Sequence, residues 1–149
     1  MSSLFIVIPA YNESENIEQT IRDWYPIVES NNKEGKSRLV IINDGSKDNT
    51  LQLVKAQMKD HPLLIALDKP NGGHGCTVLY GYRYAIKNHA DYIFQTDSDG
   101  QTNPAEFEQF WKKRNSFDAI IGNRKVRGDG KSRKFVENTV CLLLRLIFG

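Results

Sequence analysis

The sequence predicts an α/β domain in which a mostly parallel sheet carries helices on both faces. Short apolar runs recur along the 149 residues, and the stretches between them are long enough to form helices. Within several of these stretches, apolar residues follow a helical spacing behind residues that commonly begin helices. Strands that alternate with helices favour a parallel sheet, whose ligands bind beyond the carboxyl ends of the strands.

Each expected strand is short and apolar. The runs that fit this description are residues 4–8, 38–43, 63–67, 92–96 and 119–122. Val, Ile, Tyr and Phe are frequent in these runs, and these residue types are enriched in strands. With 40% hydrophobic residues, a chain of this length can bury one core, so we expect one globular domain.

Helices are expected at three places, each behind a residue that commonly begins a helix. Ser14 can cap the first helix, Asp48 or Asn49 precedes the second, and Pro104 opens the third. The apolar positions at helical spacing are Ile17, Ile21 and Trp24, then Leu51, Val54 and Met58, then Phe107, Phe110 and Trp111. These stripes are expected to face the sheet.

The cysteine pattern and the N-terminus favour a reducing, cytoplasmic environment. Cys76 and Cys141 lie far apart, and no Cys or His residues accompany them at zinc-ligand spacing. We therefore expect neither a disulfide framework nor a zinc site. The apolar run at residues 4–8 is too short for a signal-peptide core and has no basic segment before it.

Positive charge gathers in one segment although the net charge is only +2. Residues 112–134 contain nine Lys and Arg residues but only two Asp residues. This pattern is typical of a solvated helix end and loop, or of a site for phosphates or lipid headgroups. Nucleic acid is not an expected partner because aromatic residues do not alternate with these charges.

The last residues, 135–149, form an apolar segment distinct from residues 1–134. Arg145 interrupts this segment, which is shorter than the roughly 20 apolar residues that span a bilayer. We expect an amphipathic or hydrophobic helix, either packed on a protein core or lying at a membrane surface. The chain is therefore expected to divide into a domain at 1–134 and a C-terminal helix at 135–149.

Two carboxylates follow the fourth expected strand directly. Asp97-Ser98-Asp99 comes after the run Tyr92-Ile93-Phe94. Neighbouring carboxylates repel each other, and a divalent cation or a shared proton usually holds such a pair together. The motif therefore indicates metal-assisted chemistry on a substrate that carries phosphate.

The turns after the first three strands suit a nucleotide better than a nicotinamide cofactor. Tyr11 can offer an aromatic surface to a base and Glu13 can accept from ribose, whereas the glycine-rich dinucleotide turn is absent. Asp44 could accept a ring N–H of uracil or guanine, or it could serve as a turn or helix cap. The glycines of residues 71–75 would allow close backbone approach to a ligand, and His74 could contact a diphosphate or be structural.

Four polar turns stand in the order and spacing of one known family. They are Pro9-Ala10-Tyr11-Asn12-Glu13, Asn43-Asp44-Gly45-Ser46, Asn71-Gly72-Gly73-His74-Gly75 and Asp97-Ser98-Asp99. In this set the chain resembles family 2 glycosyltransferases. It is most similar to the polyprenyl-phosphate enzymes typified by dolichol-phosphate mannose synthase, over residues 4–149.

The resemblance implies a GT-A type, Rossmann-like domain that binds a nucleotide sugar. The implied donor contacts are Pro9, Tyr11, Glu13, Ile42, Asp44, Gly73, His74, Asp97, Ser98 and Asp99. The implied ligands of Mg²⁺ or Mn²⁺ are Asp97, Asp99 and Gln101, and the implied catalytic residues are Asp99 and Arg124. The acceptor phosphate would be held by Arg124, Arg127, Lys131 and Arg133.

The implied reaction is an inverting, metal-dependent transfer of the sugar to a polyprenyl phosphate at the cytoplasmic face of a membrane. An acceptor phosphate is already ionised, so it needs positioning by cations more than a general base. A UDP-sugar is the favoured donor and GDP-mannose the alternative, because Asp44 can accept from either base.

The length of the chain and its Asp97-Ser98-Asp99 motif leave other functional assignments open. Members of this branch continue beyond the position of Gly149, so we expect a truncated chain, and a non-catalytic nucleotide-sugar-binding fragment or membrane subunit is the first alternative. A haloacid-dehalogenase phosphatase is a distant one, because its Asp motif begins the domain and needs Thr or Val in place of Gln101. An EF-hand loop is disfavoured because Thr102 replaces the required Gly and Pro104 interrupts the loop.

Overall fold

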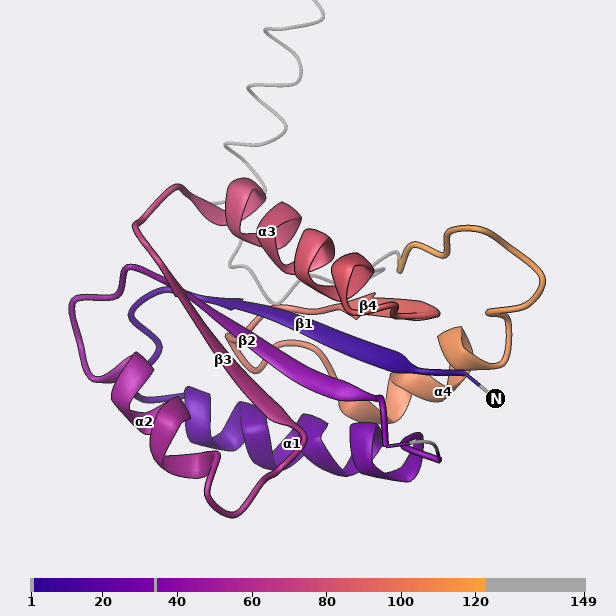
Figure 1. Cartoon of the computed structure of the whole chain (residues 1–149), viewed down its shortest axis with the longest axis horizontal. Helices are drawn as coiled ribbons and strands as arrows, with labels where there is room; N and C mark the ends of the chain where they lie inside the picture. Colours follow the sequence, from indigo (N-terminus) through magenta and orange to yellow (C-terminus); the bar gives the residue numbers. More distant parts are fainter. Residues whose placement is uncertain (1, 34, 123–149) are drawn as a thin grey trace, which may run out of the picture. The chain divides into compact units, whose positions relative to one another are not determined.

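The computed structural model describes residues 2–33 and 35–122, and these residues have the predicted α/β fold. The elements are β1 (Leu4–Ala10), α1 (Ile17–Ser30), β2 (Arg38–Asp44), α2 (Thr50–Gln57), β3 (Leu64–Lys69), α3 (His74–Lys87), β4 (Tyr92–Gln95), the 3₁₀ turn η1 (Pro104–Glu106) and α4 (Phe107–Trp111). All strand pairs are parallel, in the order β3-β2-β1-β4. Figure 1 shows α3 on one face of the sheet and α1 and α2 on the other. The predicted sheet with helices on both faces is confirmed.

The central strand β1 contributes to a core on each side of the sheet. Leu4, Ile6 and Ile8 pack with α1 in the larger core. Phe5 and Val7 point the other way and pack in a smaller core that includes Ala85 of α3. Successive side chains of a strand alternate in direction, so a strand covered on both faces is apolar throughout. This requirement explains why β1 is apolar along its whole length.

The start of α1 differs from its prediction by two residues. The helix begins at Ile17 behind Asn16, so Ser14 is not its cap, and that prediction was wrong. The apolar stripe is correct, because Ile17, Ile21 and Trp24 are all buried. The backbone N–H of Ser14 instead donates to the side chain of Asp48 in the turn after β2. This interaction is described with the site below.

The third predicted helix is present as a short two-part element, η1 and α4. Asn103 begins it, with its side-chain oxygen accepting a hydrogen bond from the N–H of Ala105 at 3.0 Å. Phe107 is buried and lies edge-to-face with Phe94 of β4, with 5.1 Å between the ring centroids. This contact brings α4 to the face of the sheet that α1 covers, and it anchors the chain just beyond the Asp97–Asp99 turn.

The predicted strand at residues 119–122 is not formed. These residues have no regular secondary structure, although the run contains the adjacent β-branched residues Ile120 and Ile121. A short run becomes a strand only where a neighbour supplies hydrogen bonds along its length, and the sheet of the described residues ends at β4. The chain divides at this point into the units Met1–Asp118 and Ala119–Gly149. The predicted boundary after residue 134 lies outside the described residues.

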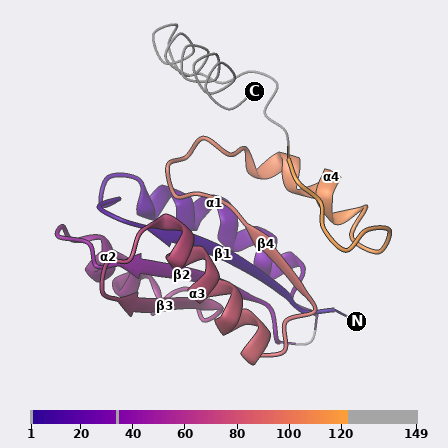
Figure 2. The same ribbon diagram turned by 90° about the horizontal axis from the view of Figure 1, so that it is seen from above.

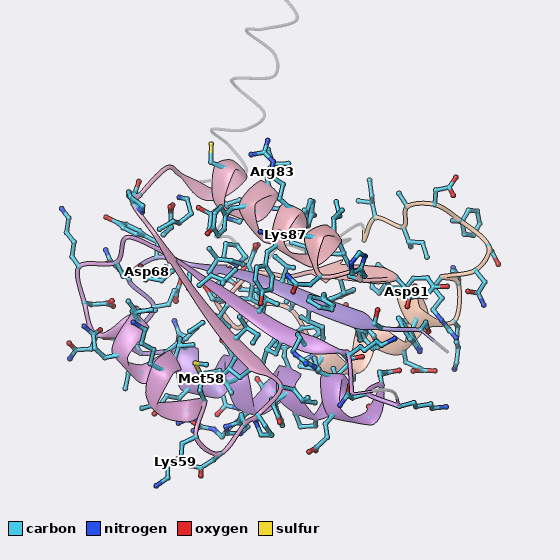
Figure 3. All side chains as sticks on the ribbon, viewed as in Figure 1. Met58, Lys59, Asp68, Arg83, Lys87 and Asp91 are labelled. Carbon is cyan, nitrogen blue, oxygen red and sulfur yellow. The ribbon has the colours of Figure 1, made fainter. Side chains whose placement is uncertain are left out.

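The outer surfaces of the helices carry many of the exposed side chains of the first unit. Figure 2 shows α3 and α1 on opposite sides of the four strands. Arg83 of α3 and Lys59, just beyond α2, are exposed and point outward in opposite directions (Figure 3). No helix within residues 2–33 and 35–122 has the length and the apolar character needed to cross a bilayer.

Candidate active site

The loops after the four strands surround an open cavity of about 480 Å³. In Figure 1 the loops that leave β1, β2 and β3 gather at the left. The cavity is lined by Pro9, Ala10, Tyr11, Glu13, Asp44, Asn71, Gly73, His74, Thr77, Asp97, Ser98 and Asp99. The chain proceeds outward from β1 to β3 and then returns to the other side of β1 as β4. Such a reversal of strand order opens a crevice at the carboxyl ends of parallel strands, where ligands of α/β sheets bind.

The structure brings all but one of the expected donor-contact residues to this cavity. The exception is Ile42, which is fully buried in the smaller core. Its side chain lies beneath α3 near Gly81, because at Ile42, two residues before the end of β2, α3 still covers the strand. Asp44, two residues further on, is the last residue of β2 and lies at the cavity.

One further expected site residue, Gln101, is not at the cavity, and four others lie outside the described part of the chain. Gln101 is exposed and is not among the residues that line the cavity. Its backbone N–H donates to Oδ1 of Asp99 at 3.0 Å, which closes a tight turn after the second carboxylate. Arg124, Arg127, Lys131 and Arg133 lie outside the described residues, so their roles remain predictions.

Ser98 joins the ends of β1 and β4 and thereby fixes the turn that carries the two carboxylates. It is buried, and its Oγ donates to the carbonyl oxygen of Pro9 at 3.0 Å. Thr20 of α1 donates to the Ser98 carbonyl oxygen at 3.1 Å. Pro9 has no N–H, and because β4 ends at Gln95 no strand lies beside Pro9 to need that donor. The carbonyl oxygen of Pro9 accepts from the Ser98 hydroxyl rather than from a strand N–H.

Asp97 and Asp99, which flank Ser98 in the sequence, both line the cavity. Gln95 donates to Asp97 Oδ1 at 3.1 Å, and His74 Nε2 lies 3.7 Å from the same oxygen. Within the described residues, no group of three or more His, Cys, Asp or Glu side chains is arranged to hold a metal ion. Two carboxylates with open coordination space nevertheless fit Mg²⁺ or Mn²⁺, which prefer oxygen ligands and keep positions for water and substrate phosphates.

Asp44 is held at the end of β2 by the loop that follows β3. The N–H groups of Gly72 and Gly73 donate to its Oδ1 and Oδ2 at 2.9 and 3.0 Å, and Lys69 Nζ pairs with Oδ1. Burial raises the pKa of the Asp44 carboxyl, but hydrogen bonds from Lys69, Gly72 and Thr77 and the charge of Lys69 outweigh it and lower that pKa. Asp44 is therefore an anion at neutral pH, and an anion can only accept hydrogen bonds.

The turns after β1 and β2 are bonded to each other, which the sequence analysis did not predict. Asn12 has a positive φ of 56°, and its side-chain oxygen accepts from the N–H of Lys47 at 2.8 Å. Three further backbone N–H groups of the first turn donate to side chains of the second: Asn12 to Ser46, Glu13 to Thr50 and Ser14 to Asp48. These bonds continue the contact between the paired strands β1 and β2 into the turns that follow them, and they hold Tyr11 and Glu13 at the cavity.

Asp48 makes this turn network dependent on pH. Burial raises the pKa of its carboxyl, but hydrogen bonds from Thr50 and Ser14 prevail and lower the pKa to about 2. A group with a depressed pKa in the folded state stabilises the fold above its unfolded pKa and loses this effect as pH falls through the folded value. The contribution of Asp48 is therefore complete above about pH 4 and is lost by about pH 2.

The Asp48→Asn variant is expected to remove this pH dependence. At pH 6 we expect it to be less stable than the wild-type chain by about 1 kcal/mol, after allowance for solvent screening. The difference should shrink between pH 4 and pH 2, as the wild-type carboxyl becomes protonated. Urea unfolding of both proteins across this pH range measures the difference, and a constant difference at all pH values would contradict the assignment.

Two site residues, Lys69 and Thr77, escaped the sequence analysis, and a third, Asn71, entered it only as part of a turn motif without a role of its own. Asn71 donates to the Asp44 carbonyl oxygen at 3.0 Å, and Thr77 accepts from Lys69 at 3.3 Å. Asp44 and Lys69 are the last residues of neighbouring parallel strands and are register partners, a relation that the sequence alone does not reveal. Opposite charges at such positions favour pairing.

Comparison with known proteins reveals a match along almost the whole chain. The sequence profile described as "Glycosyl transferase family 2" matches residues 5–145. A dolichyl-phosphate beta-glucosyltransferase, ALG5C, of Trichomonas vaginalis is 36% identical over 147 residues, covering 96% of this chain and 43% of the relative. An undecaprenyl-phosphate mannosyltransferase of Micrococcus luteus is 26% identical over 153 residues, covering 96% of this chain and 59% of the relative. The chain therefore spans less than half the length of the first of these proteins.

Solved structures share the fold at lower sequence identity. The mannosyltransferase PcManGT of Pyrobaculum calidifontis, solved in complex with GDP-Man and Mn²⁺, has a TM-score of 0.56 and 24% identity over 66% of this chain and 28% of its own. TarS of S. aureus, solved with UDP-GlcNAc, has a TM-score of 0.62 and 19% identity over 86% of this chain and 36% of its own.

The family match and the structure also exclude two of the alternatives considered from the sequence, the haloacid-dehalogenase phosphatase and the EF-hand loop. In the structure the Asp97–Asp99 turn follows the fourth strand, whereas a haloacid-dehalogenase motif begins its domain. No helix directly precedes Asp97, as an EF-hand would require. A profile that matches residues 5–145 leaves one assignment for the chain as a whole: it belongs to glycosyltransferase family 2.

Proposed function

We propose that this chain forms the donor site of an inverting, metal-dependent glycosyltransferase that transfers a sugar from a nucleotide sugar to a polyprenyl phosphate. One observation supports the proposal above all others. A family 2 chain gathers an aromatic ring, a base-reading carboxylate and a pair of carboxylates around one cavity, each from the end of a different strand. The base of a donor would use the aromatic ring and the single carboxylate, and its diphosphate would use a cation held by the carboxylate pair.

The nucleoside would occupy the side of the cavity formed by the first two turns. Tyr11 is 43% exposed and can stack on a base. Glu13 has an acceptor for a ribose hydroxyl, although its Oε2 also accepts from Asn16 at 3.0 Å. Asp44 would accept the ring N–H of uracil or guanine, whereas cytosine and adenine present an acceptor at the matching position and would be repelled.

The diphosphate would lie between α3 and the Asp97–Asp99 turn. Asp97 and Asp99 would hold the cation, with Gln101 as a further oxygen ligand supplied from the same turn. When bound, Mg²⁺ or Mn²⁺ neutralises charge on the leaving nucleoside diphosphate. His74, which lines the cavity, and the first backbone N–H groups of α3 would contact the diphosphate oxygens.

The acceptor assignment rests on the relatives and on the basic segment of the sequence. The two relatives named above act on dolichyl and undecaprenyl phosphate by name. Arg124, Arg127, Lys131 and Arg133 would position an acceptor phosphate for attack at the anomeric carbon, opposite the leaving diphosphate. The reaction would then take place at the cytoplasmic face of a membrane, and residues 135–149 would contact that surface.

Calorimetric titration of UDP-glucose and GDP-mannose, with and without Mn²⁺, tests the donor site directly. We expect Mn²⁺-dependent binding of at least one donor, with UDP-glucose the tighter. If neither donor binds at millimolar concentration, the donor-site proposal is wrong. A second assay with undecaprenyl phosphate separates the enzyme from the binding subunit, because donor binding without sugar transfer would favour the subunit.

A further inference from the structure

The carboxylate of Asp44 has little hydrogen-bonding capacity left for a base. A carboxylate has about four acceptor positions, two on each oxygen. Lys69 Nζ and the N–H of Gly72 take both positions on Oδ1. The N–H of Gly73 takes one position on Oδ2, so one position remains, and it lies on Oδ2.

The remaining position on Oδ2 can be given to a ligand. Within the described residues, the hydroxyl of Thr77 also lies within hydrogen-bonding reach of Asp44 and would compete with a base for this position. That hydroxyl has another acceptor, because it lies 3.0 Å from the Gly73 carbonyl oxygen in the first turn of α3. If an N–H group of a base takes this position, the Thr77 hydroxyl keeps the Gly73 carbonyl oxygen as its acceptor.

Lys69 is fully engaged and is not available to contact a base itself. Its three ammonium hydrogens have three partners: Asp44 Oδ1, the Pro70 carbonyl oxygen at 2.7 Å and Thr77 Oγ1 at 3.3 Å. Its side chain is only 15% exposed, and that of Asp44 is 5% exposed. The pair is thus a built part of the site wall, in which the ammonium group covers one oxygen of the base-reading carboxylate.

We propose that Lys69 determines base specificity by restricting Asp44 to a single N–H group of the base, so that the site selects uridine diphosphates over guanosine diphosphates. This inference rests on the proposed donor site. Uracil presents one N–H donor between two carbonyl oxygens, whereas guanine presents a ring N–H and an adjacent amino group. A carboxylate with both oxygens free pairs with both guanine donors. With Oδ1 covered, the amino group of guanine has no acceptor, and a buried donor without a partner weakens binding.

Four nucleotides test this inference on the unmodified chain in the presence of Mn²⁺. UDP should bind at least about tenfold more tightly than GDP, a difference of about 1.4 kcal/mol. GDP and IDP differ only by the 2-amino group of guanine, so GDP should bind no more tightly than IDP, and up to about tenfold more weakly, if that group is buried without an acceptor. UDP methylated at N3 lacks the single donor, and it should bind at least about tenfold more weakly than UDP.

The Lys69→Met variant keeps the aliphatic stem and removes the ammonium group. Oδ1 of Asp44 is then open to a second donor, so GDP should gain about tenfold in affinity relative to IDP, and the preference for UDP over GDP should fall. Lys69→Arg retains a cation with several donors and is the matched control, in which the ratios should stay near the wild-type values. Ratios within one variant cancel any general loss of affinity, and circular dichroism checks that each variant is folded.

The outcomes separate this inference from the proposal beneath it. If GDP binds the wild-type chain tenfold more tightly than IDP, both carboxylate oxygens read the base and Lys69 does not restrict them. Unchanged ratios in a folded Lys69→Met protein would also overturn the role of Lys69. If no nucleotide binds at all, the donor site itself is refuted and this inference with it. The wild-type comparison of GDP with IDP decides the question even if Lys69→Met does not fold.

Discussion

The Asp97→Asn variant is expected to lose the Mn²⁺-dependent part of UDP-sugar binding, with affinity in Mn²⁺ falling by about 100-fold. Asn has nearly the same size and keeps one oxygen, so the cavity keeps its shape while one negative charge is lost. A divalent cation bound by two carboxylates depends strongly on that charge. Changes to groups that merely support metal ligands commonly cost 10–100-fold, so loss of a ligand should reach at least about the upper end of that range.

The measurement is the ratio of donor affinities with and without Mn²⁺ in each protein. Asp60→Asn is the matched control, because Asp60 is exposed and lies before β3, at the end of the sheet away from the cavity. It makes the same chemical change, so its ratio should equal that of the wild-type chain. An Asp97→Asn protein that still binds the donor more tightly with Mn²⁺, by the wild-type factor, would exclude Asp97 as a metal ligand.

The sequence predicted the sheet well because burial on both faces leaves a clear pattern. Leu4 to Ile8 contains only apolar residues, and in the structure these side chains pack alternately into the two cores. The helix after the first turn was equally clear, since Ile17, Ile21 and Trp24 follow a helical spacing. Residues 119–122 have a similar composition but form no strand, because pairing depends on a partner that local sequence does not specify.

The site was predictable from turn motifs but not from any one contact. The sequence places Tyr11, Asp44, His74 and Asp97 after successive strands, and parallel strands bring their carboxyl ends together. It could not reveal that Asp44 is shared among Lys69, Gly72 and Gly73, because these bonds require the register of β2 against β3. Ile42 shows the same limit, since a shift of two residues along a strand separates a core position from a cavity position.

The largest stability loss is expected from Gly81→Ala, at about 2 kcal/mol or more. Gly81 lies in the middle of α3, where the helix packs on the sheet. A Cβ at this position would lie 2.4 Å from Val7 Cγ1 and 2.9 Å from Ile42 Cδ1. Both neighbours are fully buried and β-branched, so they have few alternative rotamers and α3 would have to move off the sheet.

Gly75→Ala, in the same helix, isolates this steric effect from helix propensity. No atom lies within 4 Å of a Cβ at Gly75, so alanine there should leave stability unchanged or raise it by up to about 1 kcal/mol. Urea unfolding of both variants provides the comparison.

A Val7→Ala change should partly relieve the clash that Gly81→Ala creates, so the double variant should be at least about 1 kcal/mol more stable than additivity predicts. Additive losses would mean that the helix yields elsewhere, and that contact with Val7 does not fix the distance between α3 and the sheet.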